Sequence, residues 1–340
     1  MGGYWNWMAG VFVFGILTII DNWIGLNPEN VSDANQQQVE NDKTYRMLTY
    51  LWAMAQTTFI LWAAWVVGSG KLSGWESWAG FTIGSGLVTG GIGITVAHEL
   101  GHKKSSWEKF LSKLLLMQVS YMHFYVEHNR GHHVLVATPE DPATARKGQT
   151  FYSFWIRSVF EGYIHAWQLE NESLKRKGKS PFSFQNPMIA YALLPIIFCA
   201  VLTIVINIYN GHISYAFPIF FIAQSITAFS LLEAVNYIEH YGIVRKLLAD
   251  GRYERVNPFH SWNTSHKLSN YYLFQLQRHS DHHVNAIKRY QTLNHYDESP
   301  QLPFGYPTMT LIALFPPLWF RLIDPLLDEW KEKVYLAKAA

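Results

Sequence analysis

The sequence has 340 residues, of which 49% are hydrophobic and only 15% are charged, with a formal net charge of +2. Its single cysteine, Cys199, excludes an intramolecular disulfide and any metal site that several cysteines of this chain would hold. The small net charge excludes little by itself, and we expect no nucleic-acid partner. The low charged fraction, with 14 Trp, 19 Tyr and 21 Phe residues, indicates a membrane protein instead.

Apolar residues are concentrated in five segments, each long enough to cross a bilayer as a helix. The alternative is a set of core helices in a soluble protein, but five segments with almost no charge argue against it. We therefore expect an all-α, polytopic transmembrane bundle that forms a single domain over residues 1–340. The predicted spans are residues 5–24, 47–67, 76–97, 188–209 and 213–235.

The third predicted span is rich in glycine. Its sequence GSGLVTG, residues 84–90, resembles a dinucleotide-binding turn, but that turn follows a strand and this one lies inside an apolar helix. Small residues four positions apart let helices approach closely in a membrane. We expect these glycines to pack against another helix.

The basic residues predict the topology. Of the 27 Lys and Arg residues, 12 lie in residues 98–187 and 12 lie after residue 236. The positive-inside rule therefore places residues 98–187 and 237–340 in the cytoplasm, where we expect a helical cap. Met1 would then lie outside, which is unusual for a chain without a cleavable signal, so we expect that a preceding span is missing.

Residues 107–126 are apolar enough to suggest a sixth span, although Lys109 and Lys113 lie near one end. If they crossed the membrane, His102 and His128 would lie on opposite faces. As one straight helix, the stretch between these histidines would cover about 39 Å at 1.5 Å per residue. Either arrangement forbids a shared metal site, so we expect this segment to lie in the interface or to fold back on itself.

Nine of the 15 histidines fall in four short clusters. Spacings of three or four residues place side chains on one face of a helix. Adjacent histidines diverge by roughly 100°, so the two members of such a pair can serve different metals. The clusters are His98 and His102 in HELGHKK; His128, His132 and His133 in EHNRGHH; His240 in NYIEHYG; and His279, His282 and His283 in LQRHSDHH.

Nine imidazoles are more than one ion can bind. First-row divalent ions rarely take more than about six donors, and oxygen chemistry needs an open position, so the number indicates two ions of iron, copper or zinc. HELGH alone matches the zinc-peptidase motif with Glu99 as general base, but that interpretation leaves six clustered histidines unexplained. A metal transporter would place its ligands near the bilayer midplane, whereas these clusters lie at span ends and in predicted cytosolic segments.

With these motifs the chain resembles the integral-membrane alkane monooxygenases, which are related to the membrane fatty-acid desaturases and hydroxylases. NYIEHYG, with its lone His240, is similar to alkane hydroxylases rather than desaturases. The chain departs from the family pattern at the N-terminus, where the family usually has one more membrane helix. The resemblance covers residues 5–325 and rests on HELGHKK, EHNRGHH, DPATAR, NYIEHYG, the HSWN of residues 260–263, and LQRHSDHH.

The resemblance implies that the nine clustered histidines bind two non-haem iron ions. Four carboxylates adjoin these ligands, namely Glu99, Glu127, Glu239 and Asp281. We interpret them as acceptors that fix the imidazole tautomers, which are the usual partners of metal-bound histidines. A carboxylate among the ligands is the alternative. We expect His123, His260 and His266 to form hydrogen bonds outside the clusters, and His165, His212 and His295 to be incidental.

The resemblance also implies an activity, partners and a location. The implied reaction is terminal hydroxylation of medium- to long-chain n-alkanes to 1-alkanols with O2, in a bacterial inner membrane, with the active site on the cytoplasmic side. The two electrons would come from reduced rubredoxin and an NAD(P)H-dependent rubredoxin reductase, and basic cytosolic segments would suit an acidic partner. The alternative is a related membrane oxygenase or desaturase that acts on fatty acyl or aryl-methyl substrates.

Overall fold

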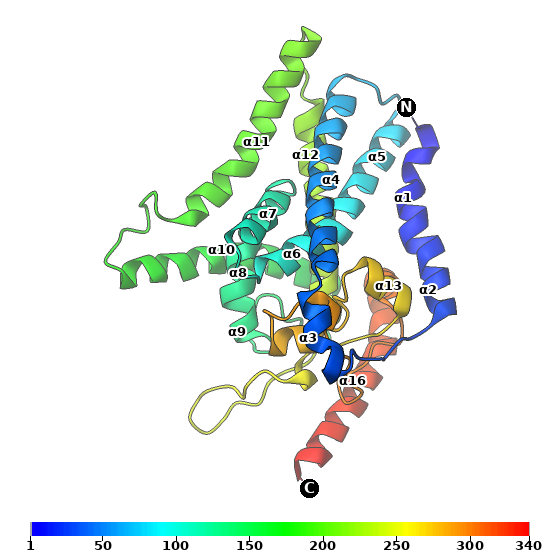
Figure 1. Ribbon diagram of the computed structural model, residues 1–340, viewed down its shortest axis with the longest axis vertical. Coiled ribbons are helices and arrows are strands. Elements are labelled where there is room, and N and C mark those ends of the chain that lie inside the picture. The colour runs from blue at the N-terminus through cyan, green and yellow to red at the C-terminus, as the bar shows by residue number, and fades with distance from the viewer. Residues whose placement is uncertain (1, 340) are drawn as a thin grey trace. The chain divides into compact units, whose positions relative to one another are not determined.

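The computed structural model describes residues 2–339, which form helices joined by turns and loops (Figure 1). These residues contain no β-strand, only three isolated bridges, so the all-α prediction is confirmed. The α-helices are α1 (Met8–Val11), α2 (Thr18–Ile24), α3 (Asp33–Asn41), α4 (Lys43–Gly68), α5 (Trp75–Val88), α6 (Thr95–Gly101), α7 (Ser106–Met117), α8 (Phe124–Glu127), α9 (His133–Leu135), α10 (Phe151–Arg176), α11 (Pro187–Asn210), α12 (Ala216–His240), α13 (Lys267–Tyr272), α14 (His279–Val284), α15 (Tyr306–Ala313) and α16 (Pro316–Ala339).

Shorter helical segments adjoin several of these helices. Three are 3₁₀-helices: η1 (Gly3–Trp7), η5 (Pro258–His260) and η6 (Tyr290–Thr292). Three are π-helical turns: η2 (Phe12–Leu17), η3 (Thr89–Ile94) and η4 (His128–His132). Such turns add a residue to a helix and often mark functional sites, and two of the three precede or contain clustered histidines.

Five helices are long and apolar enough to cross a membrane, and they coincide with the five predicted spans. Side chains on α11 explain why this bundle belongs in lipid: Ile196, Val205 and Ile208 are each more than half exposed. Contiguous exposed apolar surface is unfavourable in water and normal in hydrocarbon. The five helices are Gly3–Ile24, Lys43–Gly68, Trp75–Gly101, Pro187–Asn210 and Ala216–His240.

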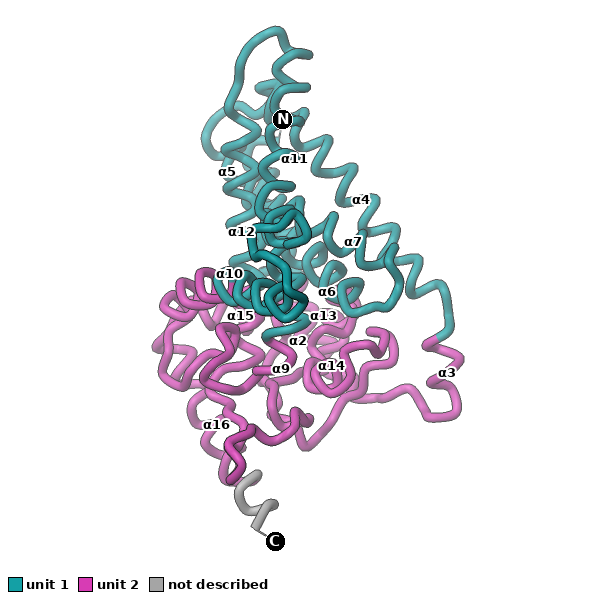
Figure 2. The backbone as a smooth tube through the Cα atoms, turned by 90° about the vertical axis from the view of Figure 1, so that its left-hand side faces the viewer, with its two compact units in different colours: residues 1–16, 41–131, 163–232 teal, residues 17–40, 132–162, 233–340 magenta. Residues whose placement is uncertain are grey.

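The chain packs as two compact units (Figure 2). Unit 1 comprises Met1–Ile16, Asn41–Gly131 and Tyr163–Leu232, and its apolar core gathers Ala63 and Phe220 with their neighbours on α4, α11 and α12. Unit 2 comprises Leu17–Glu40, His132–Gly162 and Glu233–Ala340. Its core is aromatic and contains the buried side chains of Tyr237, Tyr241, Trp262, Tyr306 and Trp319.

Residues 107–126 fold back on themselves within unit 1, as predicted. Helix α7 ends at Met117, and the chain reverses over residues 118–123, where Ser120 takes a positive φ of 52°. Helix α8 then begins at Phe124 and contacts α7, which also packs along α6. This segment is not one of the five helices able to span a membrane.

The glycines of the third span pack closely against α12, which also agrees with the prediction. A Cβ atom at Gly90 would lie 2.6 Å from the carbonyl oxygen of Ala228, and one at Gly86 would lie 2.4 Å from the Thr227 Cβ. Only glycine permits this approach, because any larger side chain would collide with the backbone or side chain of α12.

Candidate metal centre

Unit 1 brings together three of the predicted ligands, His98, His102 and His128, which we call the triad. His98 and His102 lie one helical turn apart at the end of α6, and the reversal after α7 returns the chain so that His128 meets them. The His102 and His128 Nε2 atoms are 3.1 Å apart. The ring of His98 lies 4.9 Å from that of His102 and 4.5 Å from that of His128, centroid to centroid.

Unit 2 brings together four others, His132, His240, His279 and His283, which we call the four-histidine group. Nε2 of His279 lies 3.2 Å from Nε2 of His240 and 2.9 Å from Nε2 of His283. One donor atom from each of the four residues lies within 4.8 Å of all the others. All four side chains are at least 94% buried. Their donors therefore converge in a small volume that the protein shields from water.

The two remaining clustered histidines, His133 and His282, form a pair in unit 2, with their Nε2 atoms 3.1 Å apart. Each is the sequence neighbour of a member of the four-histidine group. Adjacent histidines thus point in different directions, as the helical periodicity predicts.

Within the four-histidine group, burial favours the neutral imidazole of His283. Burial lowers the pKa of His283 well below its usual value, and the neighbouring rings of His279, His133 and His132 lower it further. Neutral imidazole keeps a nitrogen lone pair, which is the form that binds metal ions.

Asp141 is a candidate site residue that was not predicted from the sequence. It is fully buried, and its Oδ2 lies 2.9 Å from His132 Nδ1 and 2.6 Å from the hydroxyl of Thr144. Burial alone would raise the pKa of Asp141, but the charge and hydrogen bond of His132 and the hydrogen bond from Thr144 outweigh it and lower the pKa. An ionised carboxylate only accepts, so Nδ1 of His132 carries the hydrogen and Nε2 keeps the lone pair.

The sequence signal for Asp141 is the motif DPATAR, which begins with this residue nine positions after His132. In the structure Asp141 is buried and contacts His132. Arg157 holds this turn in place, because its guanidinium donates to the carbonyl oxygens of Asp141 at 3.3 Å and Thr144 at 2.7 Å.

The predicted carboxylates have different surroundings. Glu239 Oε2 lies 3.2 Å from His279 Nε2, the nitrogen that also faces His240 and His283, and Tyr306 donates to its other oxygen at 2.7 Å. Glu239 thus lies on the Nε2 side of the His279 ring, where a further metal ligand would lie, and not on the Nδ1 side. Asp281 instead accepts from Lys288, from Tyr296 and from the backbone of Asn294, none of which is an imidazole.

The other two predicted carboxylates lie in unit 1. Glu99 forms an ion pair with Lys103 at 3.0 Å. Glu127 lies 3.3 Å from Nδ1 of His165, a histidine expected to be incidental. His165 therefore contacts Glu127, the residue that directly precedes the ligand candidate His128.

Of the three histidines expected to form hydrogen bonds outside the clusters, His260 and His266 do so, and His123 contacts aromatic rings. Burial lowers the pKa of His123 to about 3, and its ring lies between those of Tyr121 and Tyr163. His260 accepts a hydrogen bond from the backbone of Asn257 and so caps η5. His266 lies 2.7 Å from the hydroxyl of Thr264.

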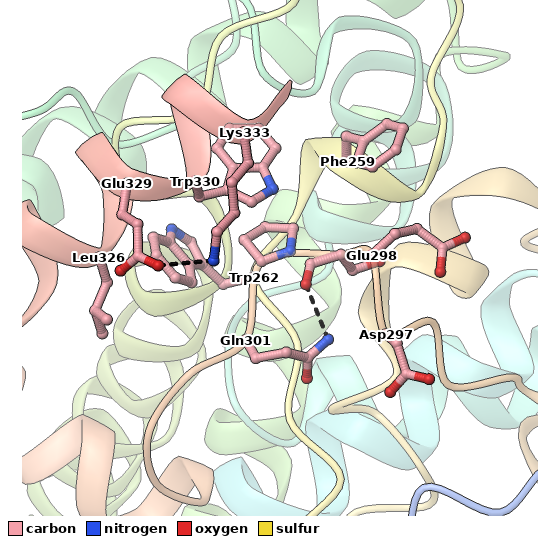
Figure 3. A pocket seen from close by; sticks show the side chains of 11 residues that line it. Phe259, Trp262, Asp297, Glu298, Gln301, Leu326, Glu329, Trp330 and Lys333 are labelled. Carbon is pink, nitrogen blue, oxygen red and sulfur yellow. Dashed lines mark hydrogen bonds and ion pairs between the residues drawn. The ribbon is translucent and has the colours of Figure 1, made fainter. Parts of the chain in front are cut away.

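Unit 2 also contains a pocket of about 650 Å³ (Figure 3). Phe259, Trp262 and Trp330 form its apolar wall, and Lys333 pairs with Glu329 at 2.7 Å beside them. The nine clustered histidines are absent from its described lining. This pocket is therefore distinct from the four-histidine group.

The spacing of the imidazole nitrogens fits a metal ion. Two donors at right angles, each about 2.1 Å from a first-row metal, lie about 3 Å apart. The Nε2 separations of 2.9 and 3.2 Å in the four-histidine group and 3.1 Å in the triad match that distance. Fold and site together define a polytopic helical membrane protein with histidine clusters that can bind metal.

Comparison with known proteins gives the family. The model of the fatty acid desaturase family matches residues 73–313. The chain is 42% identical to alkane 1-monooxygenase 2 of Pseudomonas aeruginosa over 94% of its own length and 84% of the relative's. It is 40% identical to alkane 1-monooxygenase 2 of Alcanivorax borkumensis, over 97% and 84%. The chain belongs to the alkane 1-monooxygenase family, and it is an enzyme.

A more distant relative marks the breadth of the family. The chain is 29% identical to the hydroxylase component of a xylene/toluene monooxygenase from Pseudomonas putida, over 98% of its own length and 85% of the relative's.

Proposed function

We propose that this protein hydroxylates the terminal methyl group of medium- to long-chain n-alkanes, using O2 and two electrons from reduced rubredoxin at a non-haem di-iron centre. The observation that carries the proposal is the convergence of four buried imidazoles in a chain about 40% identical to alkane 1-monooxygenases. The proposed ligands are the nine clustered histidines. The four-histidine group would hold one iron, and the triad would supply ligands to the other.

The protein's own residues prepare this centre. Asp141 fixes the ring of His132 so that Nε2 is available to a metal. Glu239 is poised beside His279 as a further donor, with Tyr306 holding its second oxygen. Burial of the imidazoles excludes water, which protects reactive chemistry from side reactions. Bound iron would supply O2 activation and oxidation of the C–H bond, which no side chain can supply.

The membrane suits such a substrate. An n-alkane dissolves in lipid and offers no polar handle, so selection would depend on the length and width of an apolar slot between spans, at about 0.8 kcal/mol per methylene transferred. By the positive-inside argument, the proposed centre faces the cytoplasm of a bacterial inner membrane.

The two electrons would come from a separate protein. With one cysteine, this chain cannot itself hold a rubredoxin-type iron site or an iron–sulfur cluster ligated by its own cysteines. Rubredoxin and its NAD(P)H-dependent reductase are the proposed donors, and the basic residues of 98–187 and 237–340 would attract an acidic partner.

The test is one assay in two parts. The purified chain is reconstituted with rubredoxin, reductase and NADH, given a series of n-alkanes, and the position of the hydroxyl group is read by mass spectrometry. Iron is measured in the wild type, in His279→Ala and in His212→Ala, which changes an exposed histidine outside the clusters. We expect two irons per chain, loss of iron and activity only in His279→Ala, and no turnover with NADH alone. Full activity with unchanged iron in His279→Ala would refute the assignment.

The xylene/toluene relative supports a second candidate, oxidation of an aryl methyl group. Toluene, xylenes and fatty acids therefore belong in the same assay. A higher kcat/KM for an aryl-methyl or acyl substrate than for any n-alkane would favour the second candidate.

A further inference from the structure

Three glutamines, Gln56, Gln118 and Gln224, are buried in unit 1, with at most 2% of each side chain exposed; we call them the glutamine cluster. Two of them belong to apolar spans, α4 and α12. Gln56 Nε2 donates to Gln118 Oε1 at 3.1 Å, and Gln118 Nε2 donates to Thr57 Oγ1 at 2.7 Å. Buried amides are costly in hydrocarbon unless they are hydrogen-bonded, so their presence here requires a specific explanation.

The glutamine cluster supplies a hydrogen-bond donor to a backbone carbonyl group at the end of α7. The last carbonyl groups of a helix have no partner within that helix. Helix α7 ends inside unit 1 at Met117, and Gln118 follows directly. Gln224 Nε2 donates to the carbonyl oxygen of Gln118 at 2.8 Å. This bond lets the chain stop the helix in an apolar environment, where no water is available to take its place.

The cluster also contacts the π-helical turn η3, which leads into α6. The hydroxyl of Thr89 lies 3.0 Å from Gln224 Oε1 and 3.0 Å from the carbonyl oxygen of Ser85, so its single hydrogen is shared between these two acceptors. A Cβ atom at Gly93 would lie 2.0 Å from Gln56 Oε1, so the glycine allows this amide to lie against η3. Each residue added to or removed from a helix rotates all later residues of that helix by about 100°, so the extra residue of η3 sets the direction of His98.

A further hydrogen bond joins α7 to α6. Ser112 Oγ, on α7, donates to the carbonyl oxygen of Ala97, the residue before His98, at 2.6 Å. Helix α7 is thus fixed to α6 next to the triad at one point and to α12 at its end.

We infer that the glutamine cluster is a positioning device for the triad: it stabilises both the reversal that returns His128 and the π-helical turn that orients His98 and His102. The inference rests on the proposed function, because it takes the triad as a metal site. In the contacts described above, the glutamines touch no imidazole. They act through the backbone of α7, η3 and α12.

The test compares two substitutions of one residue. Gln224→Met keeps the length of the side chain but loses the bonds to the Gln118 carbonyl and from Thr89, together with the local bonds to Phe221 and Ser225. Gln224→Glu is expected to stay protonated in this apolar site, so that its hydroxyl donates to the Gln118 carbonyl and its carbonyl accepts from Thr89. The matched control is Asn210→Leu, which removes a bond of 2.9 Å from Asn210 Nδ2 to the carbonyl oxygen of Gly68, between α11 and α4 of the same unit.

Metal binding is measured without turnover. Metal-free protein is titrated with Zn²⁺ against a chromophoric chelator, iron per chain is counted after reconstitution, and the midpoint of thermal unfolding is recorded. We expect Gln224→Met to weaken one class of metal sites about 10–100-fold, the range for loss of a supporting contact, while the other class is unchanged. Gln224→Glu should bind metal at the affected class as the wild type does, and Asn210→Leu should affect stability only.

Each outcome decides a separate question. Equal loss of thermal stability in Gln224→Met and Asn210→Leu, with both metal classes intact, would show that the cluster merely stabilises the bundle. If Gln224→Met does not fold, Thr57→Val removes one bond of the cluster with little change of shape, and unaltered metal binding in that variant would overturn the inference. Absence of iron sites from the wild type would refute the proposed function instead.

Discussion

The substitution Asp141→Asn tests the tautomer argument most directly, because both carboxylate oxygens already accept hydrogen bonds. Oδ2 accepts from His132 Nδ1 and from Thr144, and Oδ1 accepts from the backbone N–H of Ala143 at 3.1 Å. An amide must place its NH2 group at one of these positions. At the Oδ1 position the NH2 group would face the backbone N–H of Ala143, so two donors would meet. At the Oδ2 position the NH2 group would donate to His132 Nδ1, which would force the hydrogen of His132 onto Nε2 and remove the lone pair that a metal needs.

The expected magnitude follows from these contacts. Loss of a hydrogen-bond partner behind a metal-bound imidazole weakens metal affinity or activity about 10–100-fold, which corresponds to about 1.4–2.7 kcal/mol. A buried donor left without an acceptor costs about 1–3 kcal/mol of folding stability. We therefore expect Asp141→Asn to lose metal at the four-histidine group and to unfold at lower temperature.

The assay is competition for metal against a chromophoric chelator, combined with iron counting. Glu140→Gln is the control, because it neutralises the adjacent carboxylate, which is exposed and contacts Tyr253 at 3.3 Å. If Asp141→Asn bound metal as tightly as Glu140→Gln, the role assigned to Asp141 would be wrong.

Three further predictions concern pH, packing and metal removal. His123 has a pKa of about 3 in the folded protein against 6.5 in the unfolded chain, so the unfolded chain binds the proton first as the pH falls. The free energy of unfolding should therefore decrease between pH 6.5 and 3, by about 2 kcal/mol at pH 5. Thermal unfolding of His123→Gln should lack this pH-dependent loss of stability. Gly90→Ala should destabilise the bundle by about 1–3 kcal/mol in denaturant titrations, whereas Gly91→Ala should be tolerated, because its Cβ would meet only Leu231 Cδ2 at 3.5 Å. Iron removal by a chelator should lower the midpoint of thermal unfolding, and restored iron should reverse the change; an unchanged midpoint would argue against metal-linked stability.

Much of the fold could be predicted from the sequence because it depends on local properties. A span requires a run of apolar residues, and the five runs are visible without any partner. The spacing of His98 and His102 predicts one helical face, and the adjacency of His132 and His133 predicts divergence. The reversal of residues 107–126 followed from a distance argument alone, since a straight helix could not have returned His128 to His102.

The carboxylates show where sequence reasoning is insufficient. Adjacency to a ligand predicted Asp281 as an imidazole partner, yet it is bound by Lys288 and Tyr296. Asp141, which is not adjacent to any histidine, contacts His132. A residue next to a ligand on a helix points about 100° away from it, so the acceptor behind an imidazole comes from another segment.

The sequence by itself determined the helical spans, the types of ligand and the direction of each histidine on its helix, because these follow from composition and from a period of 3.6 residues. Only the tertiary structure decided which imidazoles share a site, which carboxylates support them and how α7 ends inside an apolar bundle. Those features depend on contacts between segments far apart in the chain, such as Gln118 with Gln224 and His240 with His279, and the pattern of either segment alone carries no information about its partner.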